Sequence, residues 1–139
     1  MTVDRPGPTD YDLEVSLSRT SHSPGQARAA ILRFLAERNV DGELKNAAAL
    51  VVTELVTNAI RHGDEPIELH VDLTNETLRV EVNDSDRHVD AVHIAAANAD
   101  WVTGRGLALV EGFAHRWGVD RRTDRGKTVW AELDTVPQL

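Results

Sequence analysis

The sequence predicts an α+β fold, a two-layer sandwich in which a mixed, mostly antiparallel sheet carries helices on one face. Three observations predict it. The expected elements follow the order strand, two helices, two strands, loop, helix and two strands. The later strands come in two pairs joined by short connections, which is typical of antiparallel hairpins. The first two helices each have one apolar side, and a sheet can bury that side.

The composition limits the class of protein. A chain of 139 residues with 41% hydrophobic residues fits one domain with its own core. A net charge of −8, with no basic run longer than Arg121-Arg122, argues against direct nucleic-acid binding and favours a partner with a basic surface. The lack of cysteine excludes disulfides and thiolate chemistry. Because no stretch of about 18 residues is apolar and the start does not resemble a signal peptide, we expect a cytoplasmic protein outside the membrane.

The domain is expected to span residues 11–134. Residues 1–10 contain little apolar material and predict a disordered tail, and residues 135–139 predict a C-terminal tail. Residues 11–17 alternate between apolar and polar side chains, which predicts a strand.

The first helix is expected to begin at Ser23 and to end near Arg38. The Ser23 hydroxyl is placed to cap the helix, Pro24 fits the first helical position, and Gln26 fits the reciprocal capping position. Its apolar face consists of Ala27, Ala30, Ile31, Phe34 and Leu35.

The second helix is expected to begin at Asp41, which can cap it, and to run to about His62. Gly63 suits the left-handed position that often follows a helix. At about 100° per residue, five apolar residues share one arc that must face the core. These are Ala48, Val52, Leu55, Val56 and Ala59.

The second half of the chain is expected to contain two hairpins and a third helix. Residues 85–103 show neither helical nor strand periodicity and predict a loop, with a short helix across residues 92–97. The third helix is expected to begin at about Gly104 and to end near Ala114. The strands pair as 66–74 with 77–84, around a turn at Asn75, and as 116–122 with 127–133.

Three polar residues form a row along the second helix. Glu54, Asn58 and His62 are four residues apart, so they lie along one stripe at the edge of the apolar arc. An amide oxygen in such a row suits Mg²⁺, which prefers oxygen ligands, and a nearby carboxylate can orient a hydroxyl or accept its proton. The alternative is an ordinary polar boundary of an amphipathic helix. For His62 we prefer a favourable interaction with the helix dipole.

Two further features are compatible with a nucleotide site. Gly104-Arg105-Gly106 precedes an apolar helix, and glycines at a helix start let phosphates approach free backbone N–H groups. Asp84 ends a strand, where its carboxylate could accept a hydrogen bond from an exocyclic amine. The alternatives are a common Gly-x-Gly turn and an aspartate that caps a turn.

Four blocks of the chain, in this order, resemble the motifs of the GHKL (Bergerat) ATPase superfamily. Residues 54–63, ELVTNAIRHG, are similar to its N-box, and residues 82–86 lie where its first glycine box falls. Residues 104–107 resemble the second glycine box, and residues 126–130 resemble the terminal strand. The resemblance covers about residues 11–134 and implies the Bergerat ATP-binding fold.

The resemblance also implies a role for each matching position. Asn58 would hold Mg²⁺, and Glu54 would be the catalytic carboxylate. Asp84 would bind the amino group of adenine, and Thr128 would support that contact through a water molecule. The nucleotide phosphates would contact the second glycine box, formed by Gly104, Arg105, Gly106 and Leu107.

Within the superfamily, the chain is similar to the small anti-sigma-factor serine/threonine kinases. Such a protein binds a sigma factor, uses ATP and Mg²⁺, and phosphorylates a serine or threonine of a STAS-domain anti-anti-sigma factor. Arg28 matches an arginine that this branch carries in its first helix near the partner surface; the alternative is a solvated helix charge. Members of the branch are often homodimers, and the sequence leaves the oligomeric state of this chain open.

The first glycine box departs from the family pattern. Asp-x-Gly-x-Gly is usual, whereas this chain reads Asp84-Ser85-Asp86-Arg87-His88 and lacks both glycines. Their loss reduces backbone freedom near the nucleotide, and Asp86 would repel phosphates if it lay close to them. Two functions from different classes therefore stay open. One is an ATP-dependent protein kinase, and the other is a partner-binding regulatory module of the same fold with weak or no ATP turnover.

Overall fold

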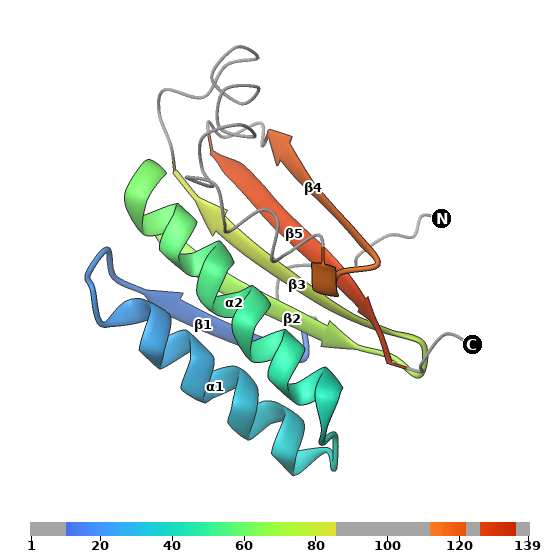
Figure 1. Cartoon of the computed structure of the whole chain (residues 1–139). Helices are drawn as coiled ribbons and strands as arrows, with labels where there is room; N and C mark the ends of the chain where they lie inside the picture. The colour runs from blue at the N-terminus through green and yellow to red at the C-terminus, as the bar shows by residue number, and fades with distance from the viewer. Residues whose placement is uncertain (1–10, 86–111, 122–125, 136–139) are drawn as a thin grey trace.

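The computed structural model describes residues 11–85, 112–121 and 126–135. Two helices pack side by side on one face of a five-stranded sheet (Figure 1), which confirms the predicted layers. The strand order is β1-β2-β3-β5-β4, and every neighbouring pair is antiparallel. The elements are β1 (Leu13–Leu17), α1 (Ser23–Glu37), α2 (Glu43–His62), β2 (Ile67–Leu73), β3 (Thr77–Asp84), β4 (Arg116–Arg121) and β5 (Lys127–Asp134).

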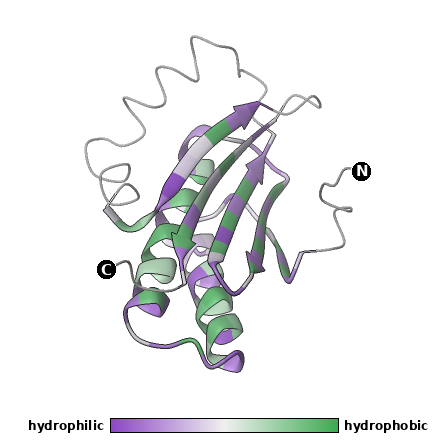
Figure 2. Ribbon diagram, turned by 90° about the vertical axis from the view of Figure 1, so that its right-hand side faces the viewer, coloured by the Kyte–Doolittle hydropathy of each residue, from purple (hydrophilic) through white to green (hydrophobic). Residues whose placement is uncertain are grey.

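The core lies between the helices and the sheet. Alternate residues of each central strand face the helices, and Figure 2 shows this alternation as bands of hydrophilic and hydrophobic colour along the strands. On β3 the helix-facing residues end with Val82 and Asp84, and on β5 they begin with Lys127 and Val129. α2 contributes eight buried residues, of which only Asn58 is polar. Burying a Leu or Val side chain stabilises the fold by about 1.5–3 kcal/mol. A buried amide does not provide this gain, so packing alone does not explain Asn58.

The two helix starts differ from the prediction. α1 begins at Ser23 itself, and the buried Ser23 hydroxyl donates to the Ser18 carbonyl instead of capping the helix. α2 begins at Glu43 with Gly42 as its N-cap, and the Asp41 carboxylate only accepts a hydrogen bond from the Gly42 amide at 2.6 Å. In both cases the side-chain oxygen is hydrogen-bonded to a backbone group of the adjoining loop, so it does not cap the helix.

The end of α2 at His62 confirms the prediction, but the role expected of Gly63 is wrong. Gly63 has φ −115° and ψ −168°, an extended conformation that any residue can adopt. The described end of the third helix is Gly112 and Phe113, close to its predicted end at Ala114. The short helix across residues 92–97, most of the loop and the start of the third helix lie outside the described residues, as do residues 1–10 and 136–139 of the tails.

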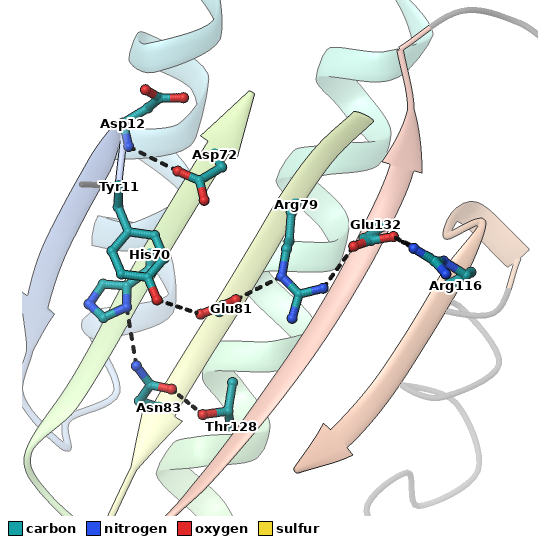
Figure 3. A network of polar contacts seen from close by, with 10 residues as sticks. All are labelled: Tyr11, Asp12, His70, Asp72, Arg79, Glu81, Asn83, Arg116, Thr128 and Glu132. Carbon is teal, nitrogen blue, oxygen red and sulfur yellow. Dashed lines mark hydrogen bonds and ion pairs between the residues drawn. The ribbon is translucent and has the colours of Figure 1, made fainter. Parts of the chain in front are cut away.

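The sheet face opposite the helices carries a polar network (Figure 3). Arg79 bridges Glu81 and Glu132, with both N–O distances at 2.7 Å, and Arg116 binds the other Glu132 oxygen. Tyr11 stacks on His70 with ring centroids 4.1 Å apart and donates to Glu81. The contacts of Glu132 with Arg79 and Arg116 join β5 to both of its neighbouring strands, and such cross-strand pairs add to the stability of a sheet beyond the backbone ladder.

Glu132 makes the stability of this face depend on pH. Its burial raises the pKa of the carboxyl, but the hydrogen bonds and charges of Arg116 and Arg79 outweigh burial, so the net pKa lies below the ordinary 4.5. The ionised group therefore contributes stability above about pH 4.5, and that contribution is lost as the pH falls through the lowered pKa.

Glu132→Gln is expected to lower the free energy of unfolding by about 1–2 kcal/mol at pH 7, because it weakens charge-assisted hydrogen bonds to two arginines. The difference from wild type should shrink as the pH falls from 5 to 2. Urea denaturation across this range measures it, with the exposed Glu14→Gln as the control. A difference that stayed constant with pH would contradict a charge-based contribution.

Candidate functional site

Three segments far apart in sequence meet at one end of the sheet: the end of α2, the end of β3 and the start of β5. A Cβ atom built on Gly63 would lie 2.4 Å from Cγ of Asp84, and one built on Gly126 would lie 2.2 Å from the Asp84 carbonyl oxygen. The Ser85 amide donates to the Asp64 carbonyl at 2.9 Å. The structure therefore brings together the N-box, the first glycine box and the terminal strand.

On α2, Glu54 and Asn58 occupy the stripe predicted for them. Glu54 is half-buried, and His62 is exposed in the last turn. Asn58 is only 4% exposed, and among the described residues its Oδ1 is one of two buried side-chain atoms without a hydrogen-bond partner. Leaving a buried acceptor unpaired costs about 1–3 kcal/mol. An oxygen in this state fits a cation or a cation-bound water, which is the role expected of Asn58.

At the end of β3, Asp84 is fully buried and already has a cationic partner. Lys127 Nζ lies 2.8 Å from Asp84 Oδ2, and Lys127 itself is only 3% exposed. The two residues face each other in the β3–β5 register and point toward the helix layer. The carboxylate expected to receive an adenine amine is thus bound by the ammonium group of the chain itself.

Lys127 was not among the predicted site residues. Strand parity could have identified it, because Lys127 is in phase with the apolar positions Val129, Ala131 and Leu133. A lysine in phase with core residues needs a buried carboxylate, and Asp84 is in phase with the core residues of β3.

The structure does not bring Thr128 to Asp84. Thr128 lies on the opposite face of the sheet, where its hydroxyl donates to Asn83 Oδ1 and Asn83 contacts His70 (Figure 3). A shift of one residue along a strand reverses the face of the side chain. The position of β5 that faces Asp84 is Lys127.

Arg28 lies on the exposed side of α1, near its start. That start lies beside the end of α2, where Arg19 Nε donates to the Ile60 carbonyl at 2.8 Å. The start of α1 is thus at the same end of the helix layer as the meeting point of the three segments (Figure 1). The second glycine box, residues 104–107, lies outside the described residues.

A cavity of about 460 Å³ opens along the same stripe of α2, toward the start of the helix. Ala47 and Leu50 line it, and they precede Glu54 and Asn58 at helical spacing. Phe113, which is exposed, and Leu133 form its other side. Glu54, Asn58 and Asp84 are not among its lining residues. The side of α2 that carries Glu54 and Asn58 therefore continues, toward the helix start, as a wall of this partly apolar cavity.

The described residues hold no group of three or more His, Cys, Asp or Glu side chains able to bind a metal. Mg²⁺ bound with a nucleotide commonly takes phosphate oxygens and water as ligands, so Asn58 could serve as a single protein ligand without such a group. Within the described ranges no helix is both long and apolar enough to cross a bilayer.

Comparison with known proteins gives a consistent family. A profile described as histidine kinase-like ATPase domain matches residues 17–133. SCO4941, an uncharacterized protein of Streptomyces coelicolor, is 38% identical over 77 residues, which cover 53% of this chain and 73% of that protein.

Solved structures share the fold at low sequence identity. The RsbU and RsbW domains of Rv1364c from Mycobacterium tuberculosis align with a TM-score of 0.65 and 20% identity over 89% of this chain. The match spans only 35% of that longer chain. The SiaB–SiaC complex from Pseudomonas aeruginosa contains a chain that aligns with a TM-score of 0.57 and 10% identity, over 89% of this chain and 90% of its own length. The catalytic domain of the histidine kinase ThkA aligns with a TM-score of 0.55 and 16% identity, over 91% and 98% respectively.

Proposed function

The chain belongs to the histidine kinase-like ATPase domain family, and from this premise we propose that it is an ATP-binding anti-sigma factor with protein serine/threonine kinase activity. Its substrate would be a STAS-domain anti-anti-sigma factor, and its second partner a sigma factor. Family membership implies the ATP-binding fold. The serine or threonine target, the use of Mg²⁺ and both partners belong to the proposal.

The buried, unpartnered Oδ1 of Asn58 carries the proposal. A polar atom in this position is costly unless a ligand completes it, and Glu54 lies one helical turn away on the same stripe. Asn58 would hold Mg²⁺, and the ion would neutralise charge on the nucleotide phosphates when bound. Glu54 would orient the partner's hydroxyl and accept its proton on a carboxylate oxygen.

Charge and fold relatives support a regulatory role with protein partners. The net charge of −8 favours association with a basic protein surface, such as one that itself binds DNA. The fold relatives include an RsbW domain and a chain of the two-protein SiaB–SiaC complex. Arg28 is exposed in the first half of α1, where it would be available to a partner.

Glu54→Gln is expected to slow phosphoryl transfer about a hundredfold, because loss of a general base commonly costs 10²–10⁴-fold. Nucleotide affinity should stay within about twofold of wild type, since Gln keeps the size of the side chain and an acceptor oxygen. The assay follows labelled phosphate from ATP to a STAS-domain protein co-purified from the native cell, with Mg²⁺ present.

Glu43→Gln is the matched control for that assay, because it removes an exposed carboxylate in the first turn of the same helix. It should transfer phosphate at the wild-type rate. Wild-type protein that binds ATP and the STAS partner but transfers no phosphate would rule out the kinase.

A second function is favoured by the Asp84–Lys127 ion pair. If the base position is closed by lysine, the domain would sequester a partner with weak or no ATP turnover. Calorimetry with ATP and with ADP separates the two functions. Partner binding without measurable nucleotide affinity would support the regulatory module.

A further inference from the structure

We infer that Lys127 takes the place of a purine amino group at Asp84, so that the base can bind only when the lysine has left the carboxylate. The inference rests on the proposed function in one respect: it accepts Asp84 as the residue that receives the base. It adds a residue that controls the affinity and the base recognition of that site.

In the part of the chain that the structure describes, the Asp84 carboxylate is closed to solvent and Oδ2 is taken by Lys127. The carboxylate is fully buried, and the ammonium group 2.8 Å from Oδ2 belongs to a side chain that is 3% exposed. On the side of Oδ2 the Gly63 backbone lies so close that a Cβ atom there would be 2.6 Å from this oxygen, and the Gly126 backbone packs against the main chain of Asp84. An incoming base would have to take the place of the lysine side chain.

The chemistry of the pair favours the lysine over a base. A lysine ammonium and the adenine amino group are both donors to a carboxylate oxygen. The lysine adds the attraction between opposite unit charges, which a neutral amino group does not provide and which is stronger in a buried site than in water. Lys127 is also held at the site by its own strand, so it has no association entropy to lose. We therefore expect nucleotide affinity to be limited by release of the lysine.

The test compares adenosine binding to wild type and to Lys127→Met by titration calorimetry. Methionine keeps an unbranched side chain of similar length and removes the ammonium group. The variant is expected to bind adenosine at least about tenfold more tightly. Lys45→Met is the matched control, since Lys45 is the only other lysine of the sequence and lies near the start of α2. It should bind adenosine as wild type does.

Purine riboside, which lacks the amino group, identifies the atom involved. The gain should be absent with this ligand, because Asp84 then receives no donor from the base. An equal gain for adenosine and purine riboside would overturn the inference, because it would mean that the substitution had only opened space. No gain for either ligand would overturn it as well.

The single variant removes the cation beside a buried carboxylate and could fail to fold, so the test includes a second variant. Lys127→Met combined with Asp84→Asn removes both charges and retains an acceptor oxygen. It should show the same preference for adenosine over purine riboside, and equal affinity for the two ligands in a folded double variant would count against the inference.

The result is separate from the fate of the kinase proposal. Phosphoryl transfer by wild type with unchanged adenosine affinity in Lys127→Met would overturn the inference alone. An adenosine gain in Lys127→Met without transfer by either protein would support the inference and overturn the kinase alone.

Discussion

Asp84→Ala is expected to lower the free energy of unfolding by about 3–5 kcal/mol, the usual cost of removing one partner of a buried ion pair. The substitution leaves the ammonium of Lys127 in a site that is 3% exposed, without the carboxylate 2.8 Å away. Since domains are typically stable by only about 5–15 kcal/mol, the variant should be close to the limit of folding. Urea denaturation followed by circular dichroism measures the loss.

Two controls separate charge from packing in that experiment. Asp120→Ala removes an exposed carboxylate from β4 and should change stability by less than about 0.5 kcal/mol. The double variant with Asp84→Asn and Lys127→Met should recover most of the loss, because neither charge remains buried. A double variant as unstable as Asp84→Ala would show that the pair contributes through shape and not through charge.

Gly126→Ala is expected to cost about 3 kcal/mol, at the upper end of the range for overpacked cores. The new Cβ would lie 2.2 Å from the Asp84 carbonyl oxygen, a backbone atom of a central strand that cannot rotate away. Gly63→Ala should cost a similar amount, because its Cβ would lie 2.4 Å from Cγ of the buried Asp84 side chain. Thermal unfolding of both variants measures the effect.

Gly25→Ala is the control for these glycine substitutions. Gly25 is exposed in the first turn of α1, and a Cβ there meets no atom within 4 Å. Alanine should leave stability unchanged or raise it by up to about 1 kcal/mol through helix propensity. If Gly126→Ala unfolded at the same temperature as Gly25→Ala, the close approach to Asp84 would have no energetic weight.

The strands and the end of α2 could be predicted because local signals fix them. Alternation identified the first strand, short connections indicated the two later hairpins, and the apolar arc from Ala48 to Ala59 followed the helix to His62. The helix starts were less predictable. Ser23 has the residue type of a cap, but its hydroxyl is used by the Ser18 carbonyl in the preceding loop. A sequence pattern shows which groups could cap, and only the folded loop determines which one does.

The site could be predicted only in part, because local spacing fixes some of its residues and the folded chain determines the others. The spacing of Glu54 and Asn58 gave their shared stripe, and the resemblance placed Asp84 at the same end of the fold. The resemblance did not indicate that Lys127 would pair with Asp84, because that contact joins residues 43 positions apart. Thr128 was predicted to support the contact at Asp84. In the β3–β5 register, however, Thr128 lies opposite Asn83, and the preceding residue, Lys127, lies opposite Asp84.

The position of β5 in the sheet also has a kinetic consequence. β5 lies between β3 and β4, and its pairing with β3 joins segments as distant as Thr77 and Asp134. Closing so long a loop costs entropy before any contact repays it, which slows folding and places such pairings late. The α1–α2 pair and the β2–β3 and β4–β5 hairpins can form from nearer neighbours, whereas β1 pairs with β2 over a comparable separation, with Leu13 opposite Val71. A nascent chain would therefore acquire its helix pair and hairpins first, and the Asp84–Lys127 pair would form only when β5 docks on β3.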